Sequence, residues 1–217
     1  MRNLFTRAIG VVVGAIFLVA CTVPTVNHVG EGSAGLFFDI PRTWQPLASD
    51  VLTKAQSSWG STEGGQAYLD ALKWQGVWSG SADVSPQQAF SNAAPEQPVV
   101  YASVRSLYDV EVQNVAGDVL SALQDSVLPV SAAAQGDGLE VITNQSYVQN
   151  GLDAVKQQLS WSTSGVRQTI DVRLVLSTEK KLLFTLWIRC SDVCRENNST
   201  AIATALDTFT VKEPSVG

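Results

Sequence analysis

The second half of the chain alternates apolar and polar residues in runs separated by short turn sequences. The runs cover 139–148, 152–162, 166–177 and 182–190. Asn150-Gly151 and Ser164-Gly165 separate the first three runs, and in an Asn-Gly hairpin both central residues must tolerate a positive φ. Connections this short force neighbouring strands to run antiparallel. The pattern therefore predicts a meander of four strands.

Helices are expected before and after this meander. Apolar residues at helical spacing predict one helix at 115–128, with Pro129 beyond its end. A closing helix is expected at 198–206, and a short one should run from Ser49 or Asp50 to about Trp59. Helices on either side of an antiparallel meander, without strand-helix-strand alternation, indicate an α+β fold with helices layered on the sheet.

Two strands are expected in the first half of the chain. The run at 36–40 ends at a proline, which favours an extended conformation before it, and 99–108 alternates in the manner of a strand. The stretch 68–79 fits a helix at its start and a strand at its tryptophan-rich end. The proline-containing stretch 83–98 is expected to be a long loop.

The first residues have the layout of an export signal. Arg2 and Arg7 precede an apolar run of about a dozen residues, which is shorter than the ~20 residues of a membrane-spanning helix. The run ends in Leu18-Val19-Ala20-Cys21, which resembles the lipobox of bacterial lipoproteins. We therefore expect Cys21 to carry a diacylglyceryl thioether and to become the first mature residue. The alternatives are an uncleaved signal anchor, or a secretory signal in which Cys21 has no role.

This interpretation divides the chain into three parts. Residues 1–20 form the signal peptide, residues 21–35 a flexible lipidated tether, and 36–212 one α+β domain with a long irregular segment near 60–98. His28 is the only histidine and is expected to be a solvated side chain of the tether. The anchor places the protein on the extracytoplasmic face of the cell membrane, because acyl chains bind the bilayer through their buried methylene groups.

The charge of the chain argues against nucleic acid as a partner. The formal charge is −6, and loss of Arg2 and Arg7 with the signal takes it to −8. An acidic surface repels nucleic acid and anionic headgroups unless a basic patch is segregated from it. The sequence indicates no such patch, so membrane contact is expected through lipid and apolar groups.

Two cysteines remain once Cys21 is assigned to lipid. Cys190 and Cys194 form an even pair in an oxidising compartment, where a disulfide is the expected state. A spacing of four puts them on one face of a helical turn, within the Cα range that a disulfide tolerates. A zinc site would need two further ligands, so no metal is expected.

The residues Phe38-Asp39-Ile40-Pro41-Arg42-Thr43-Trp44 and the closing Asp207-Thr208-Phe209 resemble those of the Mog1/PsbP-like family. The likeness spans 36–211 and is to this family as found in exported bacterial lipoproteins, with an actinobacterial origin expected. The segment 60–98 departs from it. The resemblance implies an antiparallel sheet sandwiched by helices and a binding or assembly module. It implies no catalytic residues.

No set of residues for covalent catalysis is evident. A Ser-His-Asp arrangement would need His28, which lies in the predicted tether. Ser177-Thr178-Glu179-Lys180 matches S-x-x-K, but it falls in a predicted hairpin turn and Ser191-Asp192 is followed by valine, so the match is attributed to chance. We expect no cofactor and no enzymatic activity; the alternative is an envelope enzyme that uses carboxylates alone.

The tryptophans are the remaining candidates for ligand binding. Trp59, Trp74 and Trp78 could line an apolar groove, although most buried aromatic residues simply belong to the core. The sequence thus predicts a non-enzymatic envelope lipoprotein that binds an envelope protein partner or an apolar small molecule.

Overall fold

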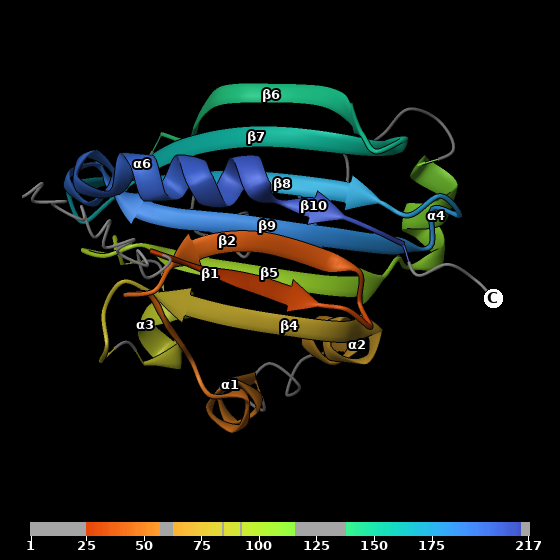
Figure 1. The fold of residues 1–217 in the computed structure, drawn as a ribbon, viewed down its shortest axis with the longest axis horizontal. Helices are drawn as coiled ribbons and strands as arrows, with labels where there is room; N and C mark the ends of the chain where they lie inside the picture. Colours follow the sequence, from red (N-terminus) through yellow and green to blue (C-terminus); the bar gives the residue numbers. More distant parts are fainter. Residues whose placement is uncertain (1–24, 57–62, 84, 92, 116–137, 214–217) are drawn as a thin grey trace, which may run out of the picture.

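A computed structural model describes residues 25–56, 63–83, 85–91, 93–115 and 138–213. In these ranges the largest element is a seven-stranded antiparallel sheet in the order β3-β4-β5-β9-β8-β7-β6 (Figure 1). Its strands are β3 (Gln45–Pro46), β4 (Leu72–Ser79), β5 (Val99–Ser106), β6 (Glu140–Gln149), β7 (Leu152–Thr163), β8 (Val166–Leu176) and β9 (Leu182–Ser191).

The predicted meander is confirmed as strands β6 to β9. Each of these strands pairs antiparallel with the next. Asn150 and Gly151 have φ values of 53° and 85°, and Ser164 and Gly165 have 52° and 79°. These positive values are the ones a two-residue hairpin turn of this type requires. Strand β9 then pairs with β5, which joins the meander to the first half of the chain.

A small sheet and the closing helix cover one face of the large sheet. The small sheet has the order β1-β2-β10, with β1 at Val26–Glu31, β2 at Leu36–Pro41 and β10 at Thr210–Val211. Helix α6 spans Asp192–Thr208 and lies beside this sheet in Figure 1. Alternate residues of β2, namely Leu36, Phe38 and Ile40, are buried in a core with Ile202 and Phe209.

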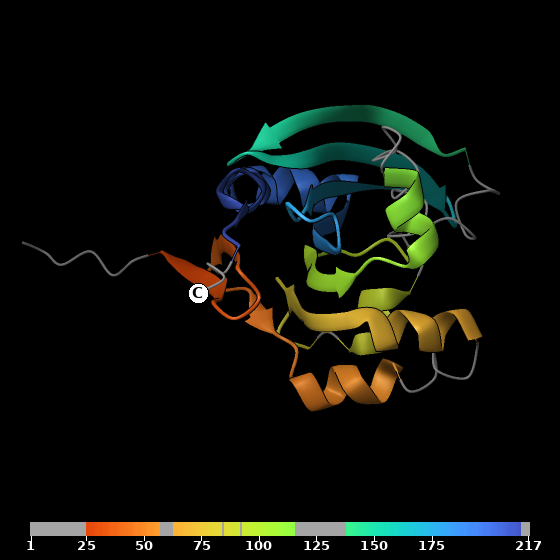
Figure 2. The ribbon, with the colours of Figure 1, turned by 90° about the vertical axis from the view of Figure 1, so that its right-hand side faces the viewer.

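The opposite face of the large sheet has a second core. Leu52 comes from α1 (Ser49–Gln56), Ala89 from α3 (Pro86–Phe90) and Val115 from α4 (Asp109–Val115). Helix α2 spans Glu63–Ala71. Figure 2 shows α6 and α4 on opposite sides of the curved sheet. The fold is therefore α+β, with an antiparallel sheet between helices, as the sequence predicts.

The predicted tether is wrong in part. Strand β1 lies inside the stretch 21–35 and pairs with β2 from Val26↔Pro41 to Glu31↔Leu36. The sequence did not predict this strand, because all residues of the strand are exposed or half-buried and it therefore lacks an alternation of buried apolar residues. The ordered domain therefore starts before residue 36, and His28 lies on a strand with Nδ1 2.5 Å from Asp39 Oδ1.

The segment near 60–98 is more regular than expected. Its described residues include α2, β4 and the short helix α3, which begins with a capping box formed by Ser85 and Gln88. The ambiguous stretch 68–79 is helical to Ala71 and extended from Leu72 onward. The closing helix is longer than predicted, because Ser191 caps it at an earlier start.

Several predicted features lie outside the described residues. They are the signal peptide at 1–20, Cys21, Trp59 and all but the first residue of the helix expected at 115–128. Val115 itself belongs to α4, whose residues 109–114 the sequence did not predict to be helical. Within the described ranges, no helix is both long enough and apolar enough to cross a membrane.

Candidate functional site

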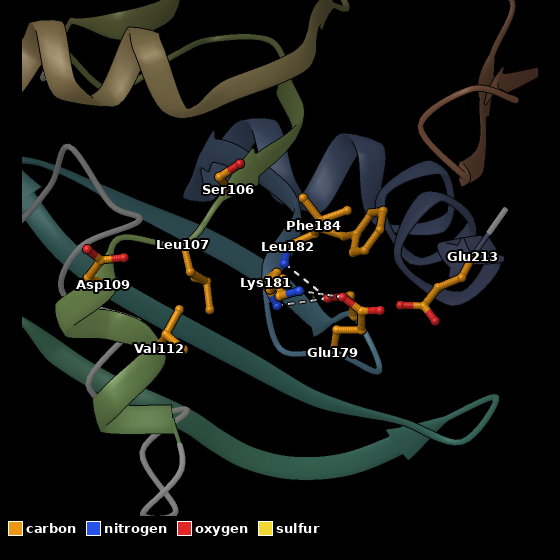
Figure 3. Close-up of a pocket in the computed structure, with 10 residues that line it drawn as sticks. Ser106, Leu107, Asp109, Val112, Glu179, Lys181, Leu182, Phe184 and Glu213 are labelled. Carbon is orange, nitrogen blue, oxygen red and sulfur yellow. Dashed lines mark hydrogen bonds and ion pairs between the residues drawn. The ribbon is translucent and has the colours of Figure 1, made fainter. Parts of the chain in front are cut away.

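A cavity of about 740 Å³ opens where strand β5 ends and the β8–β9 turn begins. Figure 3 shows α4 on one side of it and the β8–β9 turn with Glu213 on the other. The residues that line it are Ser106, Leu107, Asp109, Val112, Ser177, Glu179, Lys181, Leu182, Phe184 and Glu213. The cavity therefore joins three segments that are far apart in sequence, at 106–112, 177–184 and 213.

The interior of this cavity is apolar. Leu107 and Phe184 are buried, and Leu182 is half-buried beside them. A backbone hydrogen bond of 2.8 Å from Leu107 N to Lys181 O holds the end of β5 against the start of β9. Ligand pockets typically combine such an apolar lining with a few polar groups that orient the ligand.

The β8–β9 turn is rigidly built around Ser177. Ser177 Oγ accepts hydrogen bonds from Lys181 N at 3.1 Å and from Leu182 N at 3.0 Å. Lys180, inside the turn, adopts a φ of 53°. The S-x-x-K match thus lies in a hairpin turn, as the sequence predicts. The buried Ser177 hydroxyl stabilises the turn, which supports its interpretation as a structural residue.

The rim of the cavity is mainly acidic. Lys181 Nζ lies 2.8 Å from Glu179 Oε2, and this lysine lowers the pKa of Glu179 through its hydrogen bond and its charge. Glu213 accepts hydrogen bonds of 2.7 Å from both the backbone N and the hydroxyl of Thr178. Asp109 is exposed in the first turn of α4. The rim can therefore attract a positively charged group toward the apolar interior.

A buried ion pair positions α4 at the cavity. Arg105 Nη1 and Nη2 each lie 2.7 Å from an oxygen of Glu111, whose Oε2 also accepts a hydrogen bond from Tyr108 N. Burial alone would lower the pKa of Arg105, but the hydrogen bonds and charge of Glu111 outweigh it, and the pKa is raised. This two-bond contact fixes the helix that carries Asp109 and Val112.

Two of the three predicted ligand-binding tryptophans lie together, away from this cavity. Trp74 and Trp78 are on β4, with ring centroids 6.3 Å apart, and neither is among the residues that line the cavity. Trp78 also packs edge-on against Phe38 at 5.3 Å. Both indoles are half-buried against the first core. This packing accounts for them as structural residues, and their binding role stays a prediction.

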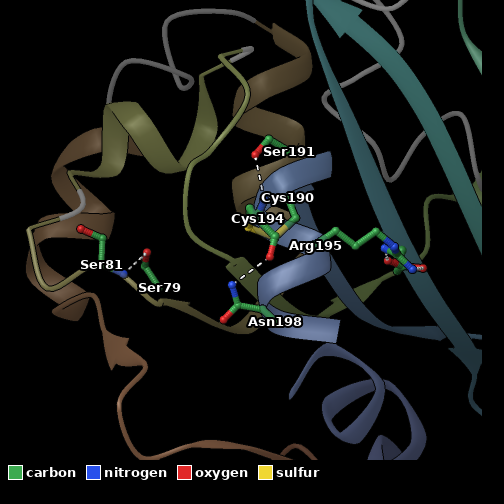
Figure 4. Close-up of a disulfide and its surroundings, with 8 residues drawn as sticks. Ser79, Ser81, Cys190, Ser191, Cys194, Arg195 and Asn198 are labelled. Atoms are coloured by element: carbon green, nitrogen blue, oxygen red, sulfur yellow. Dashed lines mark hydrogen bonds and ion pairs between the residues drawn. A yellow bond between two sulfur atoms is a disulfide. The ribbon is translucent and has the colours of Figure 1, made fainter. Parts of the chain in front are cut away.

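The predicted cysteine pair is joined in a disulfide between Cys190 and Cys194 (Figure 4). Their Cα atoms are 5.4 Å apart, within the usual range for this bond. Cys190 belongs to β9 and Cys194 to the first turn of α6, so the bond fastens the helix to the central strand. Among the described residues, no group of three or more His, Cys, Asp and Glu side chains could hold a metal ion.

No protein-family model matches the sequence, and no curated protein matches it. Solved structures do. PsbP of the cyanobacterium Synechocystis sp. PCC 6803 is 12% identical, with 89% of this chain and 96% of that chain covered and a TM-score of 0.54. A Mog1 mutant is 11% identical, with 88% of this chain and 98% of that chain covered and a TM-score of 0.50.

A third structure is that of LpqN, a protein involved in cell envelope biogenesis of Mycobacterium tuberculosis. It is 15% identical, with 87% of this chain and 91% of that chain covered, and its TM-score is 0.47, too low to support a common fold by itself. At these identities the likeness to the first two establishes the fold alone. The chain is an α+β protein with an antiparallel sheet between helices. Within that class, its fold is Mog1/PsbP-like.

Proposed function

We propose that this protein is a lipoprotein of the bacterial cell envelope, anchored through Cys21, whose domain binds a protein partner or an apolar ligand without catalysing a reaction. The observation that supports the binding role is the apolar cavity between α4 and the β8–β9 turn. The observation that supports the lipid anchor is the lipobox that ends at Cys21. A Mog1/PsbP-like fold is compatible with both, but it does not identify the partner.

The chemistry of the cavity favours binding over carboxylate catalysis. A carboxylic acid that donates a proton near neutral pH needs a raised pKa. The hydrogen bond and charge of Lys181 instead lower the pKa of Glu179. Glu213 is fixed in position by two hydrogen bonds from Thr178. These carboxylates are suited to act as fixed negative charges at the mouth of an apolar site.

The binding role is tested with two matched variants of helix α4. Val112 lines the cavity and Val110 does not, although both valines are exposed on the same helix. Val112→Glu places a charge against the apolar lining, so it should reduce binding of the neutral apolar dye Nile red by about tenfold. Val110→Glu should bind the dye like the wild type. Equal binding by all three proteins would contradict the assignment of this cavity.

The anchor is tested separately. Cells fed a palmitate analogue should label the wild-type protein and leave Cys21→Ala unlabelled. Intact mass of the mature wild-type protein should show acyl groups on its first residue. A bare thiol at that residue, with the protein free in the culture medium, would disprove the anchor and leave the binding experiment unaffected.

Proteins and lipids captured from native membranes by the wild type and Val110→Glu, but not by Val112→Glu, would then be candidates for the ligand.

A further inference from the structure

Two cations face each other across strands β7 and β8. Lys156 and Arg173 are directly opposite in the antiparallel register, and both side chains are half-buried. Like charges in directly opposite positions on neighbouring strands destabilise a sheet. The arrangement therefore opposes folding unless another group compensates for it.

The chain does not supply that group among its described residues. In those ranges neither Lys156 nor Arg173 forms an ion pair. Arg173 Nη1 donates a hydrogen bond of 3.2 Å to Val172 O, which is uncharged. The positive charges of this pair are thus uncompensated by a carboxylate from the described chain.

The neighbouring row of the same sheet face shows the contrast. Asp171 is directly opposite Gln158, whose Nε2 donates a hydrogen bond of 2.7 Å to Asp171 Oδ1. Arg195 extends from α6 toward the sheet in Figure 4. It forms an ion pair with Asp171. The charge of Asp171 is therefore already matched by Arg195. Only one row away, no carboxylate of the described residues lies within ion-pair distance of Lys156 or Arg173.

A cavity of about 210 Å³ lies at this pair, lined by residues of β6, β7 and β8. The residues that line it are Thr143, Lys156, Gln157, Gln158, Asp171 and Arg173. Thr143 contributes a hydroxyl group, and the carboxylate of Asp171 in this lining is already paired with Arg195. The volume is several times the ~30 Å³ that a water molecule occupies in the liquid, so a small anion with bound water fits. The strands that line the cavity run side by side in Figure 1.

We propose that this cavity binds a phosphate group between Lys156 and Arg173. An arginine presents a planar set of N–H donors that matches two phosphate oxygens, and a lysine adds a compact positive charge. The source is either inorganic phosphate or the phosphodiester headgroup of an anionic lipid. The sequence indicated no segregated basic patch in a chain of charge −6. Strand pairing creates a local one.

The first test compares phosphate with chloride at equal ionic strength, using the full chain. Phosphate should raise the unfolding temperature of the wild type more than chloride does, because a ligand of the folded state stabilises it. In Lys156→Met this difference should disappear, and phosphate affinity measured by calorimetry should fall by about tenfold. Lys73→Met, at an exposed lysine of β4, is the matched control and should behave like the wild type.

A second readout separates binding from a purely structural effect. In chloride alone, Lys156→Met should be at least as stable as the wild type, since it removes the repulsion with Arg173. If Lys156→Met does not fold, Lys156→Gln replaces it, because glutamine keeps most of the side chain without the charge. Circular dichroism confirms the fold of each variant before binding is measured.

Vesicles distinguish the two sources of phosphate. The full chain with Cys21→Ala is mixed with vesicles of phosphatidylcholine, with or without phosphatidylglycerol. Flotation that depends on phosphatidylglycerol and is lost with Lys156→Met identifies a lipid headgroup. Stabilisation by phosphate without flotation identifies the free anion. If the wild type and Lys156→Met respond alike to phosphate and to both vesicles, the proposal is wrong. Val112→Glu should not change these results, so this site and the apolar cavity are tested independently.

Discussion

The indole of Trp78 lies over Gly76, its neighbour on the same face of strand β4. A Cβ atom at Gly76 would lie 2.3 Å from Trp78 Cη2. Real Cβ atoms do not approach other heavy atoms this closely, so only glycine accommodates the indole in this position. The gap in the apolar alternation of β4 is thus the space that the tryptophan fills, between the strand and Phe38.

Replacing this glycine should displace the indole. Gly76→Ala is expected to lower the free energy of unfolding by about 1–3 kcal/mol, the usual cost of adding a methyl group to a packed site. Urea denaturation measures the loss, and near-ultraviolet circular dichroism should report the altered tryptophan environment. Gly64→Ala in helix α2 is the control, because nothing lies within 4 Å of its added Cβ. It should be neutral or raise stability by up to about 1 kcal/mol. Equal stability and equal spectra of wild type and Gly76→Ala would contradict this account.

The strands of the meander could be predicted because their signals are local. Alternating residues define β6 to β9, and the turns at Asn150-Gly151 and Ser164-Gly165 fix the pairing. Strand β1 gives no such signal, since its pairing with β2 stabilises it rather than burial of its own side chains. The described part of helix α4 has seven residues, too few for a clear helical periodicity, and is held by the contact of Glu111 with Arg105.

The two cavities differ in how far the sequence could reveal them. The apolar cavity unites the end of β5, helix α4, the β8–β9 turn and Glu213, and no motif links these segments. The pairing of Lys156 with Arg173, by contrast, could have been predicted from the sequence. Lys156 lies eight residues before Ser164 and Arg173 eight residues after Gly165, so a two-residue turn at that point places them opposite each other.

The buried pair of Arg105 and Glu111 should be essential for stability. Glu111→Leu leaves the Arg105 guanidinium buried without its counter-charge, which typically costs about 3–5 kcal/mol. The double variant Arg105→Met/Glu111→Leu should recover most of that loss, because an apolar pair removes the uncompensated charge. Gln113→Leu, at an exposed position of the same helix, is the control. Urea denaturation measures the stability of the four proteins, and a Glu111→Leu protein as stable as the wild type would refute the role of the pair.

The disulfide should make a modest contribution to stability. It closes a loop between residues separated by four positions, so its loss restores little chain entropy to the unfolded state. The double variant Cys190→Ala/Cys194→Ala is expected to lose about 2 kcal/mol. Urea denaturation of the wild type with a reductant should give a similar loss, and the reductant should not affect the double variant. Alkylation of the unfolded, unreduced wild type at Cys190 or Cys194 would show that the bond is absent in solution.

Tyr101 should make the protein sensitive to alkaline pH. Burial, followed by the contact with Tyr68, raises the pKa of Tyr101 well above its ordinary value of 10.0. Above about pH 10 the unfolded chain loses this proton while the folded protein retains it, so stability falls as the pH rises. Urea denaturation at about pH 8 and about pH 11 should show this fall in the wild type and a smaller one in Tyr101→Phe. At neutral pH the variant should lose about 1 kcal/mol, because the hydroxyl group of Tyr101 makes a hydrogen bond of 2.7 Å with Tyr68. The same loss between the two pH values in both proteins would show that Tyr101 does not cause the sensitivity.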